Sequence, residues 1–369
     1  MKFTCSQISL NKAINTVSKA VSSKTTMPIL KGILLEVKGQ DLYLTSSDLD
    51  ISIKTSVMIS DGEDGSAVVN AKMLGDIIRK LPNSLIRIET DEKNFLKLSC
   101  LGSEFSLVTF PAEEYPSIGE INKEKAIKLN GYSLRKLIRR TSFAASIDEK
   151  KGILVGCLLN MKNDYLEMVA LDGFRMAVAK ENISFVDERD IIVPAVSLDI
   201  IERILTDTLG EKPIDIYFDE KKISVVCEET TIIARLLEGN YIKYKDIIPT
   251  SYSSRVVVNR EELLSSLERA SLFAREGKHN LIKISVGTEN IIINSRSEEG
   301  NINESISAET EGNELVIGFN SKYIMDVLKS LDDEEIAIEM SSSTSAALIK
   351  PVEGDSYTYL VLPVRILGN

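Results

Sequence analysis

The chain has 369 residues, which is longer than one ordinary domain and corresponds to about two or three domains. Hydrophobic residues make up 43% of it and charged residues 27%, a balance that excludes a disordered or fibrous protein. The formal net charge of -11 excludes a protein that coats nucleic acid or anionic membranes through bulk positive charge.

In chain order, a helical pattern of apolar or small residues at i, i+3, i+4 and i+7 occurs six times. It predicts helices at residues 10–20, 71–81, 132–146, 195–205, 259–275 and 320–331. Between them, short runs of apolar residues predict strands, for example Leu42 and Leu44 around Tyr43, Leu166 and Met168 around Glu167, and Ile291 to Ile293. Each third of the chain therefore reads as strands, helix, strands, helix, strands.

The helical patterns recur at nearly constant spacing. The first pattern of each third begins at Leu10, Leu134 and Leu263, which are 124 and 129 residues apart. The second begins at Leu74, Leu198 and Ile324, which are 124 and 126 residues apart. One third of the length is 123 residues, so three copies of one α+β unit explain the chain better than two unrelated domains. Proline-containing stretches at residues 110–125 and 247–254 mark the boundaries.

Cysteine and histidine usage restricts the chemistry. The four cysteines, Cys5, Cys100, Cys157 and Cys227, lack paired spacing and are interpreted as reduced core thiols of a cytosolic protein. No secretory leader and no run of 18 apolar residues occurs, so export and membrane spanning are not expected. With His279 as the one histidine, and without a phosphate-binding loop or nucleophile elbow, no convincing catalytic constellation is present.

Charge is distributed unevenly along the chain. The six predicted helices sum to +8, which leaves -19 for the rest of the chain. The segment 132–146 is the clearest case, because it contains Arg135, Lys136, Arg139 and Arg140 and no acid. Exposed helix faces often carry Lys and Arg, but a bias summed over six helices also suits a polyanion held through sequence-independent phosphate contacts.

Ordered segments along the whole chain resemble the β subunit of bacterial DNA polymerase III, the sliding-clamp family. They include the opening MKFT, TMPILKGILLEV (26–37), LTSSDLDISI (44–53), FSLVTFPAEEYP (105–116), ALDGFRMAV (170–178), LLEGNYIKYKDIIP (236–249), IGFNSKYIMDVLKSL (317–331) and YLVLPVRI (359–366). Each is short, but in this order they are highly specific.

The resemblance implies an α+β fold of three tandem clamp domains, each with two helices packed on antiparallel sheets. We expect them at residues 1–122, 123–249 and 250–369. Two chains would close head to tail into a ring around duplex DNA, with helices lining the hole. The implied function is a cytoplasmic, non-enzymatic processivity factor without a cofactor or metal. Its implied partners are the polymerase III catalytic subunit, the clamp loader, and other polymerases and repair proteins.

The family's partners insert a short motif, with Gln and bulky apolar residues, into a pocket between the second and third domains. The matching positions are Leu154, Leu171, Gly173, Phe174, Arg175, Met176, Ile242, Ile247, His279, Asn320, Tyr323, Thr344, Leu360, Val361, Leu362, Pro363, Val364 and Arg365. Read without the resemblance, LVLPV is a buried terminal strand. Ile242, Phe174, Asp246 and His279 depart from residues common in the family, which changes the expected shape of the pocket wall.

Two further sets of positions follow. The candidate DNA contacts are Lys24, which matches a family position, and the helix residues Lys12, Lys72, Arg79, Arg135, Lys136, Arg139 and Arg140. The candidate dimer contacts are Phe105, Leu107, Leu272 and Phe273, which otherwise read as ordinary core residues. Two alternatives remain open: an enzyme that binds a metal through Asp48, Asp50 and Asp172 for phosphate chemistry, and a repeat protein that binds peptides but no DNA.

Overall fold

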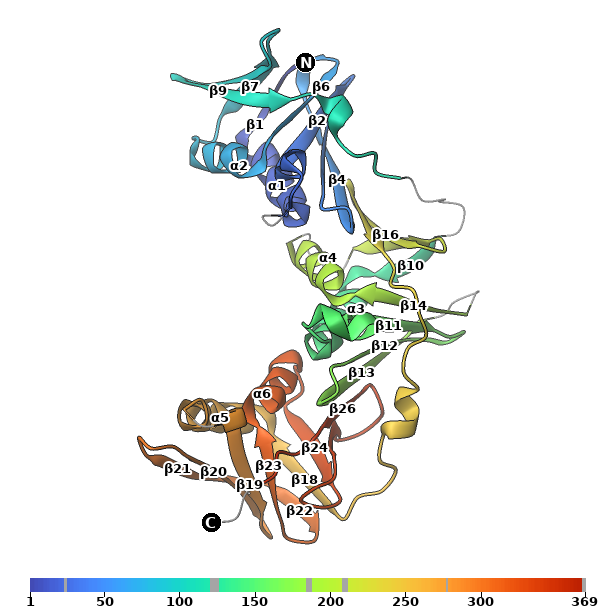
Figure 1. Cartoon of the computed structure of the whole chain (residues 1–369), viewed down its shortest axis with the longest axis vertical. Coiled ribbons are helices and arrows are strands. Elements are labelled where there is room, and N and C mark those ends of the chain that lie inside the picture. The colour runs from blue at the N-terminus through green and yellow to red at the C-terminus, as the bar shows by residue number, and fades with distance from the viewer. Residues whose placement is uncertain (23–24, 120–125, 184–187, 208–211, 277, 367–369) are drawn as a thin grey trace. The chain divides into compact units, whose positions relative to one another are not determined.

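A computed structural model describes the chain except for residues 23–24, 120–125, 184–187, 208–211, 277 and 367–369 (Figure 1). The chain folds into two compact units. The first unit comprises Met1–Arg135 with Val196–Leu236, and the second comprises Lys136–Ala195 with Leu237–Asn369. Neither unit coincides with one of the three predicted repeats, because each contains strands of the central repeat.

The first unit is built on one antiparallel sheet of thirteen strands in the order β10-β15-β16-β17-β4-β3-β2-β6-β9-β8-β7-β1-β5. The strands are β1 (Lys2–Ser6), β2 (Gly32–Lys38), β3 (Asp41–Ser47), β4 (Ile51–Met58), β5 (Ser60–Glu63), β6 (Gly65–Asn70), β7 (Leu85–Thr90), β8 (Phe95–Cys100), β9 (Ser103–Phe110), β10 (Ile127–Asn130), β15 (Pro213–Phe218), β16 (Lys222–Cys227) and β17 (Thr230–Arg235). Helices α1 (Gln7–Val17) and α2 (Ala71–Lys80) pack together on this framework.

The second unit contains two antiparallel sheets, one of nine strands in the order β14-β11-β12-β13-β26-β25-β24-β18-β22 and one of four in the order β21-β20-β19-β23. Their strands are β11 (Gly156–Met161), β12 (Tyr165–Leu171), β13 (Arg175–Asn182), β14 (Arg189–Pro194), β18 (Ser254–Asn259), β19 (Leu281–Val286), β20 (Asn290–Arg296), β21 (Asn301–Ser307), β22 (Glu309–Gly312), β23 (Leu315–Asn320), β24 (Glu335–Met340), β25 (Ala347–Pro351) and β26 (Tyr357–Val361). Helices α5 (Arg260–Ala274) and α6 (Ser321–Ser330) pack against each other.

In each unit one ladder joins strands of different repeats. In the first unit β17 pairs with β4, with Ala234 opposite Ile51. In the second unit β26 pairs with β13, with Val361 opposite Arg175. The sheets therefore continue across the repeat boundaries instead of ending there.

The predicted helices are confirmed, with shifted ends. α3 (Gly131–Thr141) and α4 (Ala195–Asp207) complete the set of six α-helices in the described residues. Of the predicted core positions only Ile77 and Glu202 are half-buried, and the others are buried. The predicted segment 132–146 is too long because Thr141 leaves helical geometry at φ -132°. The segment 10–20 begins too late because the Ser6 hydroxyl caps α1 by accepting from the Ser9 amide.

The apolar core contains all four cysteines, which are buried, as predicted. Burial raises the pKa of the Cys5 thiol to about 12, so it stays protonated and packs as a small apolar group. Within the described part of the chain, no helix combines the length and the apolar character needed to cross a membrane.

Candidate functional site

A tight turn in the second unit connects β12 to β13 and anchors the end of β26. The Asp172 carboxylate accepts hydrogen bonds from the backbone amides of Phe174 (2.8 Å) and Arg175 (3.1 Å). Gly173 occupies the left-handed region at φ 93°, which glycine adopts without steric cost. The Leu362 amide then donates to the Phe174 carbonyl at 2.9 Å, so the end of β26 is fixed beside the turn.

Apolar side chains gather at this turn, and we name this surface the apolar groove. Its floor includes the buried side chains Leu171, Met176 and Leu360, which belong to one hydrophobic cluster against which Leu154 packs. Its rim is formed by Phe174, Ile242, Ile247 and Leu362, which are 41% to 56% exposed. Tyr241 and Ile248, the neighbours of Ile242 and Ile247, pack on the same cluster and hold that part of the rim in place. A buried apolar floor with an exposed apolar rim suits an extended peptide with bulky side chains.

Arg175 lies beneath this rim rather than on it. Its side chain is 10% exposed and pairs with Asp172 at 3.1 Å and Asp326 at 2.6 Å, while it donates to the Phe143 carbonyl at 2.7 Å. Its guanidinium lies 4.7 Å from the centre of the Tyr323 ring. Because its donors are engaged internally, Arg175 positions the turn against α6.

Tyr323 in turn supports the exposed Phe174. The two rings stack with centroids 6.4 Å apart and an interplanar angle of 24°. Burial is the main reason that the pKa of the Tyr323 phenol is raised. Lys151, which sequence reasoning missed, donates to the Asp172 carbonyl at 2.7 Å and lies 5.5 Å from the centre of the Phe174 ring. No sequence pattern pointed to Lys151, because its place depends on the fold of the 3₁₀ segment Glu149–Val155, to which it belongs.

The remaining groove candidates have separate places. Asn320 caps α6 by accepting from the Lys322 amide, and Val361 is fully buried in β26. The alternative interpretation of LVLPV as a buried strand therefore holds for Leu360 and Val361, but not for Leu362. Pro363, Val364 and Arg365 follow β26, and the Val364 amide donates to the Gly318 carbonyl. Thr344 is exposed in the turn before β25, and His279 lies at φ 66° in the turn before β19; neither belongs to the apolar cluster.

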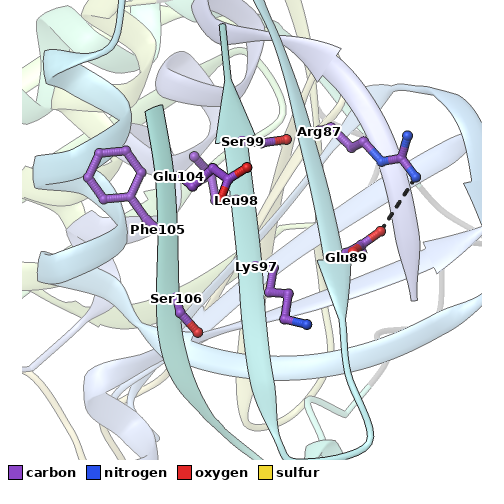
Figure 2. Close-up of a pocket in the computed structure, with 8 residues that line it drawn as sticks. All are labelled: Arg87, Glu89, Lys97, Leu98, Ser99, Glu104, Phe105 and Ser106. Carbon is purple, nitrogen blue, oxygen red and sulfur yellow. Dashed lines mark ion pairs between the residues drawn. The ribbon is translucent and has the colours of Figure 1, made fainter. Parts of the chain in front are cut away.

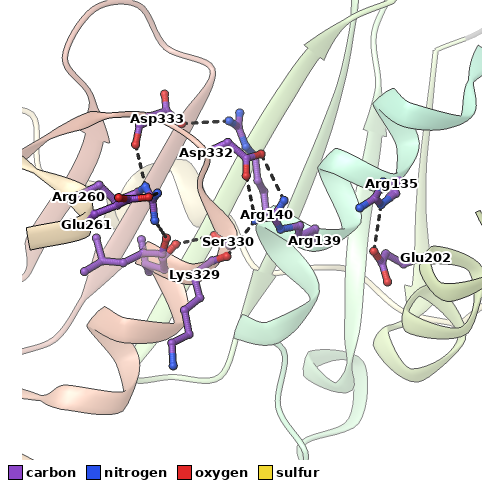
Figure 3. A network of polar contacts seen from close by, with 12 residues as sticks. Arg135, Arg139, Arg140, Glu202, Arg260, Glu261, Lys329, Ser330, Asp332 and Asp333 are labelled. Carbon is purple, nitrogen blue, oxygen red and sulfur yellow. Dashed lines mark hydrogen bonds and ion pairs between the residues drawn. The ribbon is translucent and has the colours of Figure 1, made fainter. Parts of the chain in front are cut away.

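The basic residues of α3 are engaged in ion pairs (Figure 3). Arg135 pairs with Glu202 at 3.3 Å, and Lys136 pairs with Glu181 at 2.6 Å. Arg139 pairs with Asp332 at 3.0 Å, and Arg140 pairs with Asp333 at 3.2 Å. Arg140 is only 7% exposed and lies over the Tyr357 ring, so its guanidinium is engaged inside the unit. The sequence alone did not predict these ion pairs, because the acidic partners lie far from α3 along the chain.

The other basic candidates differ in accessibility. Lys12 on α1 and Lys72 on α2 are exposed. Arg79 pairs with Asp76 at 2.6 Å on the surface of α2. Lys24 lies outside the described residues, so its proposed DNA contact rests on the sequence alone. Lys12 and Lys72 are therefore the better phosphate candidates among the described residues.

The candidate dimer contacts lie at the surface. Phe105 is 36% exposed on β9, and Leu272 is 61% exposed on α5. Leu107 and Phe273 are half-buried. Phe105 also lines a hollow of about 570 Å³, together with Arg87, Lys97 and Glu104 (Figure 2). The alternative that these four are fully buried core residues does not fit this exposure.

The carboxylates proposed for a metal enzyme have structural partners. Asp48 accepts from the amides of Asp50 and Ile51, as Asp172 does in its own turn. Asp50 is exposed and lies 3.9 Å from Arg235. In the described residues no cluster of three or more His, Cys, Asp or Glu side chains has the arrangement of a metal site. These turns therefore provide no support for the metal-enzyme alternative.

Comparison with known proteins agrees with this geometry. The profiles of the DNA polymerase III beta subunit match in order: the N-terminal domain at residues 1–119, the central domain at 128–243 and the C-terminal domain at 245–365. The beta sliding clamps of Staphylococcus epidermidis and Staphylococcus aureus are each 34% identical to this chain, over 99% of both partners.

Solved structures show the same relationship. The DNA polymerase sliding clamp of Bacillus subtilis superposes with a TM-score of 0.94 at 33% identity and covers 100% of both chains. A sliding clamp of Pseudomonas aeruginosa bound to griselimycin gives a TM-score of 0.92 at 30% identity, over 99% of this chain and 100% of that one. With three domain profiles in order and relatives matched end to end, the chain belongs to the bacterial DNA polymerase III β subunit family, the β sliding clamps.

Proposed function

We propose that two copies of this chain close head to tail into a ring that encircles duplex DNA and tethers polymerases to it. The observation that carries the proposal concerns a turn that occurs once in each repeat. Among the described residues, the turns of the first and second repeats each have a strand of another repeat docked beside them, and the turn of the third does not. The missing third strand is supplied, in this proposal, by a second copy of the chain.

The three turns share one hydrogen bond. The Asp48 amide donates to the Ile51 carbonyl, the Asp172 amide to the Arg175 carbonyl, and the Ser297 amide to the Gly300 carbonyl. After the first two turns, β4 and β13 receive β17 and β26. After the third turn comes β21, which ends the order of its sheet among the described strands. In the first repeat, β9 occupies the position that β26 occupies in the third and keeps a free edge opposite β8 over its first half.

The two observed ladders fix the register of the proposed one. Ile51 lies opposite Ala234, and Arg175 lies opposite Val361. After the third turn, the residue equivalent to Ile51 and Arg175 is Gly300. In β9, Phe110 and Pro111 match Leu362 and Pro363. The residue of β9 that corresponds to Val361 is therefore Thr109. Antiparallel pairing then brings Ile302 opposite Leu107 and Asn303 opposite Ser106 in the second copy.

This register agrees with the direction of the side chains. Asn303 and Ser106 are both exposed, whereas Ile302 and Leu107 are both half-buried on the other face. A slip of one residue would place apolar side chains opposite polar ones, which sheets avoid. Each edge also has a hollow beside it, about 530 Å³ lined by Leu281 and Ile302 and about 430 Å³ lined by Leu81 and Phe105. These hollows would accept the half-buried Leu107 and the exposed Leu272 of the opposing copies.

The experiment is a disulfide across the proposed ladder. Asn303→Cys with Ser106→Cys in one chain should crosslink two copies at both interfaces upon mild oxidation, because opposed β-carbons lie within disulfide reach. Asn303→Cys with Val108→Cys, a diagonal pair on the same face, is the matched control and should crosslink poorly. The native cysteines are buried and give little background.

The crosslinked ring also tests encirclement. Rings loaded on nicked circular DNA and then oxidised should remain on the circles through a denaturing wash and slide off after linearisation. Loss from circles, or equal retention on linear DNA, would contradict encirclement. Proteins that form no dimer at any concentration would contradict the ring itself.

The remaining parts of the proposal follow from the surface. Lys12 and Lys72 offer phosphates exposed cations, whereas the overall charge of -11 limits adhesive binding, as sliding requires. The apolar groove would take the short motif of the polymerase III catalytic subunit, the clamp loader, and other polymerases and repair proteins. In this proposal the chain works in the cytoplasm and catalyses no reaction itself. Phe174→Asp should weaken a motif peptide at least about tenfold by placing a charge on the apolar rim.

A further inference from the structure

The first unit contains a second copy of the backbone that forms the apolar groove. Asp48 accepts from the amides of Asp50 (3.0 Å) and Ile51 (2.8 Å), as Asp172 accepts from those of Phe174 and Arg175. The residue after each aspartate has positive φ, 82° at Leu49 and 93° at Gly173. The Arg235 amide donates to the Asp50 carbonyl at 2.9 Å, which is the distance from the Leu362 amide to the Phe174 carbonyl.

The segment that leaves the sheet is also equivalent. Tyr115 follows β9 and Tyr241 follows β17, and burial raises the pKa of both phenols, that of Tyr115 to about 12. The backbone of Ser47 partly offsets this shift for Tyr115, and the backbone of Leu171 does so for Tyr241. Residues 116–119 then line a hollow of about 90 Å³ beside the first turn.

The side chains that line the two sites differ in polarity. Superposing the two turns and ladders pairs Leu171 with Ser47, Phe174 with Asp50, Met176 with Ser52, Ala346 with Lys222 and Leu362 with Arg235. The first member of each pair is apolar, and the second is polar or charged. Other pairs stay apolar on both sides, such as Leu360 with Ile233 and Leu154 with Leu30. We name the second set, Ser47, Asp50, Ser52, Lys222 and Arg235, the polar groove.

We infer that the polar groove is a second copy of the partner groove, and that its five side chains exclude the apolar partner segment. An apolar anchor that enters it would displace water from Asp50, Lys222 and Arg235 without replacing their hydrogen bonds, which costs more than the anchor gains. Each chain therefore presents one partner site although it contains the same backbone twice. This inference rests on the proposed function, because it presumes that the apolar groove binds the partner motif.

The experiment exchanges side chains between the two sites. The gain variant combines Asp50→Phe, Ser52→Met, Lys222→Ala and Arg235→Leu, three of which alter charged groups in the polar groove. The loss variant combines Phe174→Asp and Leu362→Arg at the exposed rim of the apolar groove. A third protein combines both sets. The probe is a fluorescein-labelled synthetic peptide with one glutamine and three bulky apolar residues, and calorimetry gives the number of sites per chain.

The inference predicts one peptide per chain for the natural protein, none for the loss variant, two for the gain variant and one for the combined protein. A gain variant that still binds one peptide, with a combined protein that binds none, would overturn the inference. A natural protein that binds none would instead refute the proposed function.

If the gain variant does not fold, judged by its thermal midpoint, the test moves to exposed positions alone. Asp50→Phe with Arg235→Leu, made in the loss variant, should show second-site binding at millimolar peptide by ligand-observed NMR. The loss variant itself should show none under the same conditions. Equal signals from the two proteins would contradict the inference.

Discussion

The dimer interface can be probed at Leu272, where a small change has a calculable effect. The side chain is 61% exposed in the free chain, and in the proposed ring it is covered by the edge of a second copy. Full burial of a leucine side chain contributes about 1.5–3 kcal/mol, so covering the exposed part contributes about 1–1.5 kcal/mol relative to alanine. A ring of two chains has two such interfaces. Leu272→Ala should therefore cost about 2–3 kcal/mol and weaken dimerisation roughly 30- to 150-fold.

Sedimentation velocity over a concentration series measures this dissociation constant directly. The matched control is Val196→Ala, because Val196 is an exposed apolar residue of α4, 71% accessible, that the proposed interface does not use. The control should leave dimerisation unchanged. An unchanged constant for Leu272→Ala, or equal weakening by both variants, would show that α5 does not form the interface.

Three further predictions concern single residues. Arg140→Ala should lower the free energy of unfolding by about 3 kcal/mol in denaturant titrations, because it leaves the Asp333 carboxylate without its ion pair. The control Lys329→Ala, which removes an exposed ion pair, should lower it by less than about 0.5 kcal/mol. Equal losses for the two variants would contradict a structural role for Arg140. Lys12→Ala and Lys72→Ala should each reduce the salt dependence of duplex DNA binding by about one phosphate contact. Arg139→Ala should reduce it less, because Arg139 is paired with Asp332. A larger effect of Arg139→Ala would contradict the assignment of phosphate contacts to Lys12 and Lys72. Burial raises the pKa of Tyr115 from 10 to about 12, so the stability that its neutral phenol contributes is complete below pH 10 and is lost as the pH rises towards 12. In thermal melts over a pH series, Tyr115→Phe should therefore lose less stability between pH 10 and pH 12 than the natural protein. An unchanged pH profile would contradict this prediction.

The helices were predictable because their signal is local. Burial at every third or fourth residue, as at Leu10, Ala13 and Ile14, requires only the periodicity of one helix. The ends were less predictable, since the start of α1 depends on one hydroxyl, that of Ser6.

The ion pairs of α3 were not predictable for a related reason. Four basic residues in α3 look free in the sequence, but their acidic partners come from distant segments, such as Glu181 and Asp332. Pairs of this kind are determined by tertiary packing, and no spacing rule along the chain identifies them. The groove was predictable only as a set of positions, because the inward role of Arg175 depends on Asp326 of α6.

The ladder between β4 and β17 has a practical consequence for dissecting this protein. A fragment that ends with the first repeat, at residue 122, would lose β17 and leave the edge of β4 that faces β17 unpaired along Ile51–Lys54. Bare strand edges of this kind recruit other strands, so such a fragment should aggregate in expression trials. The segments that repeat along the chain are thus not the segments that can be produced alone, and a soluble fragment of the first unit must also carry residues 213–235.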